Sequence, residues 1–92
     1  MKVLVIDDEQ AIRDALGRKL RREGFGVTLC GDGLEGLRAF HSERPDLVIL
    51  DIVMPGGMDG LTLCRRIREV AETPIMMLSA QAITEDDIIE GL

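Results

Sequence analysis

Three aspartates stand at points where predicted strands end. Asp7 and Asp8 directly follow the apolar run VLVI, and Asp51 directly follows the run LVIL. Both runs are typical of strands that are buried on both faces of a parallel sheet. Because ligands of open α/β sheets bind beyond the carboxyl ends of the strands, neighbouring strands would bring these carboxylates together. A cluster of buried charges is costly without a cation, and Mg²⁺ takes carboxylate ligands, so the sequence predicts a magnesium pocket.

The first acidic group has a second interpretation, which is a helix start. Asp7, Asp8 and Glu9 precede an amphipathic segment, and acidic residues are favourable at the beginning of a helix. The recurrence of a strand-end aspartate at Asp51 favours the metal pocket. Ser79 ends a further predicted strand, IMMLS, where an ordinary strand-end hydroxyl and a functional one are both open interpretations.

The elements that must position these residues alternate between strands and helices, which is typical of βαβ units. Strands are expected at residues 3–6, 25–30, 47–51 and 75–79, the second of them at a sheet edge because it contains Gly26. Helices are expected over 10–23, after the GDG of residues 31–33, around 61–67, and from Thr84 onward. The inward residues are predicted to be Ile12, Leu16 and Leu20 in the first helix, Leu34, Leu37 and Phe40 in the second, and Leu61, Cys64 and Ile67 in the third.

Composition narrows the classes of partner. Ninety-two residues make one domain, and a net charge of −6 argues against nucleic acid or an anionic membrane as a direct partner. The basic runs RKLRRE and CRRIRE contain Leu or Ile at helical spacing and are expected to be solvated helix faces. Cys30 and Cys64 lack metal-ligand spacing and are expected to be buried free thiols. No run predicts a signal peptide or a membrane span, so we expect a cytoplasmic protein.

Three motifs occur in order along the chain: VLVIDDE, LVILDIVMPGGMDG and PIMMLSA. Together they resemble the receiver domain of two-component response regulators. The resemblance implies an α/β fold, the flavodoxin-like (CheY-like) doubly wound parallel sheet, whose five strands have the order 2-1-3-4-5. It also implies a phosphorylation-dependent signalling switch rather than an enzyme, in which Asp51 accepts a phosphoryl group from a sensor histidine kinase.

Residue by residue, the resemblance implies the roles of the site. Asp8 and Asp51 would bind Mg²⁺ directly, with the main-chain carbonyl of Val53 as a third protein ligand and Asp7 acting through water. Ser79 would donate a hydrogen bond to the phosphoryl group in the active state. The chemistry is consistent with these roles, because phosphoryl transfer needs an in-line nucleophile and charge neutralisation.

The chain departs from the family pattern in two places. The loop DIVMPGGMDG is one glycine longer than the family's D-x-x-M-P-x-M-D-G, at Gly56-Gly57. The family also continues through a fifth strand with a lysine and a fifth helix, which these residues do not include. We therefore expect residues 1–92 to be a C-terminally incomplete receiver domain with strand order 2-1-3-4 and the fifth strand absent. The exposed edge of the fourth strand would favour a homo-oligomer.

Two other functions stay open. One is an interaction fragment of a receiver that takes up no phosphate, because the family's lysine is missing. The other is a Mg²⁺-dependent phosphohydrolase of the haloacid dehalogenase type, which also uses a strand-end aspartate. That family needs a second Asp two residues further on, where this chain has Val53.

Overall fold

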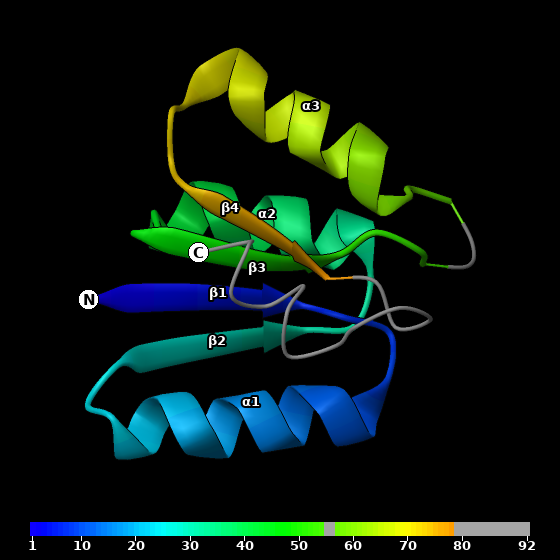
Figure 1. Cartoon of the computed structure of the whole chain (residues 1–92). Helices are drawn as coiled ribbons and strands as arrows, with labels where there is room; N and C mark the ends of the chain where they lie inside the picture. The colour runs from blue at the N-terminus through cyan, green and yellow to red at the C-terminus, as the bar shows by residue number, and fades with distance from the viewer. Residues whose placement is uncertain (55–56, 79–92) are drawn as a thin grey trace.

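The computed structural model of the protein describes residues 1–54 and 57–78 (Figure 1). In chain order the elements are β1 (Lys2–Ile6), α1 (Gln10–Arg22), β2 (Gly26–Cys30), α2 (Gly33–Glu43), β3 (Leu47–Asp51), α3 (Gly60–Val70) and β4 (Ile75–Leu78). Every element predicted within these residues is present, with small shifts at the ends. Ser79 and the helix predicted from Thr84 onward lie outside the described residues.

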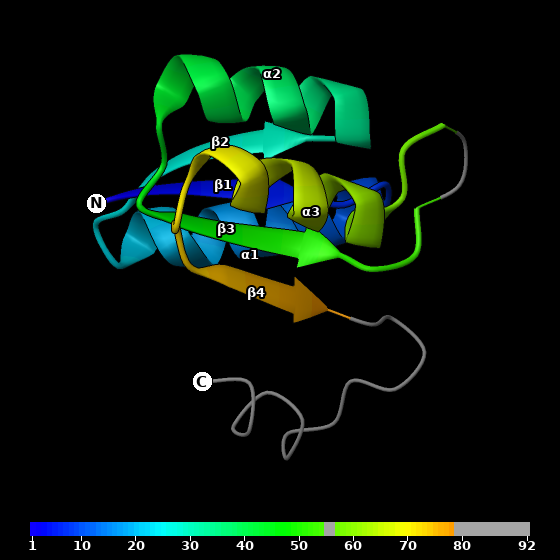
Figure 2. The same ribbon diagram turned by 90° about the horizontal axis from the view of Figure 1, so that it is seen from above.

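The strands form one parallel sheet of order β2-β1-β3-β4 (Figures 1 and 2). Ile6, the last residue of β1, lies opposite Cys30 of β2 on one side and opposite Leu50 of β3 on the other. The chain moves outward from β1 to β2 and then returns across β1 to β3, so the strand order reverses between β1 and β3. The predicted doubly wound sheet is confirmed, and its switch point lies where the aspartates end their strands.

Helices cover both faces of the sheet. On one face α1 contributes Leu16 and Leu20 to a core around Val3 and Val5 of β1. On the other face α2 and α3 contribute Phe40, Leu63 and Ile67 to a core around Leu4 and Ile6 of the same strand. Because consecutive residues of β1 face different helices, each of them must be apolar, and this explains the unbroken run VLVI.

The buried faces of α2 and α3 differ from the prediction at two leucines. Leu34 is 52% exposed and Leu61 is 51% exposed, whereas both were predicted to face inward. α2 approaches the sheet through Gly36, where an added Cβ would lie 2.5 Å from Cδ1 of Ile6, so its buried stripe runs along glycines to Phe40. In α3 the buried stripe begins at Gly60 and continues at Leu63, which places Leu61 on the opposite side.

Several smaller predictions can be compared directly with the structure. The first helix ends close to its predicted boundary, because Gly24 has a φ of 92° just after α1, which is a conformation that favours glycine and stops the helix. The Lys and Arg side chains of both basic runs are exposed, as expected of solvated helix faces. Both thiols are free, but only Cys30 is buried, since Cys64 is half-buried. Among the described residues, no helix combines the length and apolar character needed to cross a membrane.

Candidate functional site

The three strand-end aspartates lie together at the carboxyl edge of the sheet. Asp7 and Asp8 follow β1, and Asp51 is the last residue of the neighbouring strand β3. Each of the three side chains offers one oxygen, and these oxygens all lie within 4.8 Å of one another. Asp7 and Asp51 are only 2% and 3% exposed, whereas Asp8 is exposed. The structure thus brings together the carboxylates that the two apolar runs predicted to converge.

Main-chain and side-chain hydrogen bonds fix Asp7 at the centre of the cluster. Its N–H donates to the carbonyl oxygen of Cys30 at 3.1 Å, which ties the end of β1 to the end of β2. Its Oδ1 accepts the N–H of Glu9 at 2.9 Å, so the loop before α1 folds back onto the carboxylate. Glu9 is the N-cap of α1 but provides no side-chain capping hydrogen bond. The helix-start interpretation therefore describes a local turn at Asp7 and does not remove its carboxylate from the cluster.

Burial and mutual repulsion disfavour the ionised forms of the two buried aspartates. Burial raises the pKa of Asp51 from its ordinary value of 3.8 to about 6, an effect that the N–H of Val53 opposes and the charge of Asp7 reinforces. Burial also raises the pKa of Asp7, where the N–H of Glu9 opposes the shift and the charge of Asp8 adds to it. Both raised pKa values indicate a site in which the nearby positive charge does not offset the burial and repulsion of the carboxylates.

The cluster fits a hard divalent cation. Mg²⁺ prefers oxygen ligands and is usually held by one or two carboxylates together with water and phosphate oxygens. Two buried carboxylates and one exposed carboxylate supply those ligands, and a cation would offset both the burial and the repulsion. The exposed side of the cluster, at Asp8, leaves access for water or a phosphoryl group.

The loop after Asp51 is held against the helix that follows it. The N–H of Val53 donates to Oδ1 of Asp51 at 3.1 Å, and the N–H of Gly60 donates to the carbonyl oxygen of Ile52 at 3.2 Å. A Cβ at Gly60 would clash with the carbonyl oxygen of Asp51, so only glycine permits this approach. Asp59 caps α3, since its Oδ1 accepts the N–H of Thr62 at 2.7 Å.

The roles predicted for the remaining site residues stay predictions. The Val53 side chain is 62% exposed, and the role of its carbonyl as a metal ligand stays a prediction. Gly57, which belongs to the longer loop, has nothing within 4 Å of an added Cβ, so no close packing requires glycine there. Ser79 lies outside the described residues, and its contact with a phosphoryl group stays a prediction.

Sequence reasoning did not identify Arg13 as part of this region. Its Nη1 donates to the carbonyl oxygen of Asp7 at 2.7 Å. One signal was available in the sequence, because Arg13 lies in the first turn of α1, which contains no acidic residue. A helix N-terminus disfavours cations, so a basic residue there points to a specific contact outside the helix.

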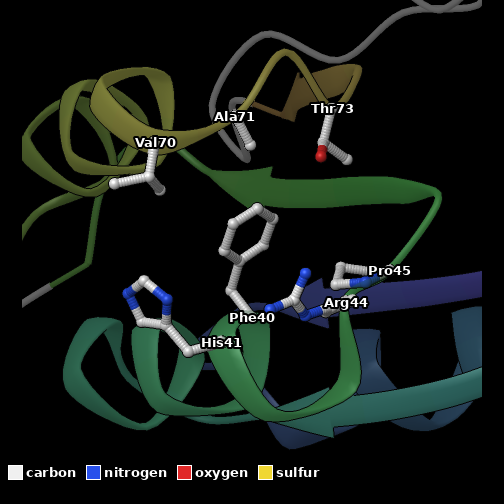
Figure 3. Close-up of a pocket in the computed structure, with 7 residues that line it drawn as sticks. All are labelled: Phe40, His41, Arg44, Pro45, Val70, Ala71 and Thr73. Carbon is white, nitrogen blue, oxygen red and sulfur yellow. The ribbon is translucent and has the colours of Figure 1, made fainter.

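A separate groove of about 380 Å³ lies at the other end of the strands (Figure 3). It is formed where α2 leads into β3 and where α3 leads into β4, and its lining residues are Phe40, His41, Arg44, Pro45, Val70, Ala71 and Thr73. Since β3 and β4 run parallel, their amino ends and the aspartate cluster are at opposite edges of the sheet. The groove is therefore not part of the carboxylate site.

Comparison with known families identifies the kind of domain. Residues 3–92 match the family model of the response regulator receiver domain. The chain is 47% identical over 90 residues to the transcriptional regulatory protein CseB of Streptomyces coelicolor, covering 98% of this chain and 38% of that protein. It is 44% identical over 87 residues to the transcriptional activator protein PfeR of Pseudomonas aeruginosa, covering 95% of this chain and 28% of that protein. The chain thus spans well under half the length of these relatives.

Solved structures agree with the fold. A Francisella response regulator receiver domain aligns with a TM-score of 0.81 and 35% identity, over 98% of this chain and 74% of that one. The response regulator TrrA of Thermotoga maritima, solved in complex with Mg²⁺ and a beryllium fluoride, aligns with a TM-score of 0.79 and 41% identity. That alignment covers 86% of this chain and 69% of that one.

Proposed function

The chain belongs to the response regulator receiver domain family, and from this we propose that it is a phosphorylation-dependent switch of a two-component system. In this proposal Asp51 accepts a phosphoryl group from a sensor histidine kinase. The observation that carries the proposal is the carboxylate cluster, in which Asp7, Asp8 and Asp51 place oxygens within 4.8 Å of one another. A nucleophilic carboxylate beside a divalent cation is sufficient for phosphoryl transfer.

We assign Mg²⁺ as the cofactor of this site. Asp8 and Asp51 would bind it directly, the carbonyl of Val53 would be the third protein ligand, and Asp7 would act through water. When bound, the ion supplies positive charge that neutralises the carboxylates and the transferring phosphoryl oxygens. The complex of TrrA with Mg²⁺ supports this assignment, because that protein is 41% identical over the aligned region.

Asp51 is oriented for the reaction by its own loop. The N–H of Val53 holds Oδ1, which leaves the second carboxylate oxygen for the attack on phosphorus. In the transfer, an O–P bond forms at Asp51 as the N–P bond to the kinase histidine breaks. The imidazole leaves with the bonding electrons and takes up a proton from solvent. The reaction needs the ionised carboxylate, and a bound cation favours that form over the protonated one.

Ser79 would then donate a hydrogen bond to the phosphoryl group, and partners would recognise the resulting change in the surface of the domain. We propose that the chain turns over no substrate of its own and contacts no nucleic acid directly, which its net charge of −6 supports. The names of CseB and PfeR describe regulators of transcription, which supports transcription as the process that the switch controls.

The two alternatives have less support. A phosphohydrolase of the haloacid dehalogenase type needs an acid where this chain has Val53, and the family match is to receivers. An interaction fragment that takes up no phosphate does not account for the two buried carboxylates, Asp7 and Asp51, because unpaired buried charges lower stability.

One experiment separates the three functions. The protein is incubated with acetyl phosphate and Mg²⁺, its intact mass is followed over time, and hydrolysis of p-nitrophenyl phosphate is measured in parallel. The variants Asp51→Asn and Asp14→Asn are compared, because Asp14 is an exposed carboxylate on α1 and tests for nonspecific labelling.

A switch retains one phosphoryl group per chain in the wild type and in Asp14→Asn, and none in Asp51→Asn. Continuous release of p-nitrophenol that depends on Asp51 would identify a hydrolase instead. A chain that stays unmodified throughout would identify an interaction fragment and contradict the proposal.

A further inference from the structure

The Arg13 side chain links two loops at the carboxyl edge of the sheet. Its Nη1 donates to the carbonyl oxygen of Asp7, in the loop between β1 and α1, at 2.7 Å. The same nitrogen would lie 3.2 Å from a Cβ added at Gly31, in the loop between β2 and α2. The guanidinium group therefore lies beside Gly31, between the β1–α1 loop that it bonds and the β2–α2 loop that it packs against.

The hydrogen bond from Arg13 acts on the peptide group that precedes Asp8. The carbonyl oxygen of Asp7, the nitrogen of Asp8 and both Cα atoms lie in one plane, because the peptide bond is planar. Fixing that oxygen therefore restrains the position of the Asp8 Cα atom, from which the Asp8 side chain starts. Asp8 is exposed, so burial does not hold it in place as it holds Asp7 and Asp51.

We propose that Arg13 is a positioning residue for the divalent cation site. It fixes the Asp7–Asp8 peptide against the β2–α2 loop, so that the Asp8 carboxylate stays within reach of Asp51. This inference rests on the proposed function, because it concerns the same cation. Arg13 touches neither the cation nor the phosphoryl group and acts through the main chain of Asp7.

The sign of the effect distinguishes positioning from simple electrostatics. Arg13 carries a positive charge, and removing it would by itself make the surroundings of the cluster more negative and tighten cation binding. Loss of a positioning contact acts in the opposite direction, because an exposed Asp8 that samples other orientations must be ordered when the cation binds. Weaker binding in a charge-removing variant therefore identifies positioning.

The test is a double-mutant cycle between Arg13 and Gly31, with Mg²⁺ as the probe. The dissociation constant for Mg²⁺ is measured by calorimetry for the wild type, Arg13→Ala, Gly31→Ala and the double variant. A Cβ at Gly31 would lie 3.2 Å from Nη1 of Arg13, a tight contact, so Gly31→Ala shifts the guanidinium group by a few tenths of an ångström and strains its hydrogen bond to Asp7 without changing any charge. Arg18→Ala is the matched control, since Arg18 is an exposed residue of the same helix with the same charge. Arg13→Lys keeps the positive charge but carries its donor group on a shorter side chain.

We expect Arg13→Ala to weaken Mg²⁺ binding by about three- to tenfold, at or below the usual range for residues that orient metal ligands. Gly31→Ala should weaken binding in the wild-type background and have no further effect when Arg13 is already alanine. Arg13→Lys should lie between the wild type and Arg13→Ala, and Arg18→Ala should leave binding unchanged or slightly tighter. Urea unfolding without metal checks that each variant is folded, and Gly31→Ala carries the test if Arg13→Ala is not.

Unchanged or tighter binding in Arg13→Ala, with a wild type that binds Mg²⁺, would overturn the positioning role alone. Additive effects of Arg13→Ala and Gly31→Ala would also overturn it, because they would show that the two residues act independently. A wild type that binds no Mg²⁺ would instead overturn the proposed function, and the inference with it.

Discussion

Asp51 is a carboxylate whose surroundings favour its protonated form, although its proposed reaction needs the ionised one. Burial raises its pKa to about 6, and the charge of Asp7 adds to that effect against the opposing N–H of Val53. A cation in the cluster would reverse this balance. Cation binding, protonation and stability are therefore coupled at this one residue.

The pH dependence of stability follows from that coupling. Without metal, the folded state holds the Asp51 proton more tightly than the unfolded state does, so the stabilisation from protonation is complete below the ordinary pKa of 3.8. This stabilisation is lost as the pH rises through about 6. As the pH rises from 3.8 to about 6, we expect the free energy of unfolding of the wild type to decrease relative to that of Asp51→Asn. Urea unfolding in EDTA measures both proteins, and a difference that rises or stays constant over this range would contradict the account.

The response to Mg²⁺ is the second prediction for Asp51. Binding only to the folded state stabilises it by about 2.7 kcal/mol when Mg²⁺ is at 100 times its dissociation constant. Asp51→Asn should be more stable than the wild type in EDTA above neutral pH, because repulsion with Asp7 is removed, and it should lose most of the Mg²⁺ response. Thermal melting with and without Mg²⁺ measures both effects. Equal shifts in the two proteins would show that Asp51 is not a ligand.

At the scale of elements, the start of α3 is set by a close approach of main chains. A Cβ at Gly60 would clash with the carbonyl oxygen of Asp51 and lie 2.8 Å from the carbonyl oxygen of Ile52. Gly60→Ala must therefore displace α3 or the loop after β3, and we expect a loss of about 2–4 kcal/mol of stability. Gly57→Ala is the control in the same loop, because a Cβ there has open space. A urea midpoint for Gly60→Ala equal to that of Gly57→Ala would show that the approach is not required.

The elements could be predicted from the sequence because strand and helix periods differ. The unbroken runs before Asp7 and Asp51 predicted strands buried on both sides, and the ends of these strands located the carboxylates. The inward faces of the short helices were harder to predict. Leu34 and Leu61 have the size of core residues, but glycines at positions 36 and 60 decide which side of each helix approaches the sheet.

Other features of the site could not be predicted because they arise from contacts between loops. The hydrogen bond from Arg13 to Asp7 joins a helix to the loop before it and passes over a third segment at Gly31. Its geometry depends on how α1 packs on the sheet, which periodicity does not specify. The raised pKa of Asp51 likewise needs the burial and the neighbouring charge that only the folded chain provides.

At the scale of the whole molecule, β4 is an edge within the part of the chain that the structure describes. It pairs with β3 and with no other described strand, and its four residues are all half-buried. Apolar strand edges favour pairing with another chain, and a two-fold symmetric dimer would join two such edges. We therefore predict self-association through β4 at tens of micromolar.

Light scattering on a size-exclusion column tests this prediction. Met76→Lys places a charge on β4 and should shift the protein to a monomer. Leu34→Lys changes an exposed leucine of α2, a helix whose main contacts are with β1, β2 and α3, and should not. A monomeric wild type at these concentrations, or equal effects of the two variants, would contradict pairing through β4.

The most direct test of the central claim is to locate the phosphoryl group on the chain. The protein is labelled with acetyl phosphate in Mg²⁺ or in EDTA, the acyl phosphate is trapped by borohydride reduction, and the modified residue is identified by peptide mass spectrometry. The account predicts modification at Asp51 that depends on Mg²⁺ and is absent from Asp7 and Asp8, since Asp51 is the proposed nucleophile and the other two complete the cation site. Modification at another residue, or equal labelling of Asp51 in EDTA, would contradict it.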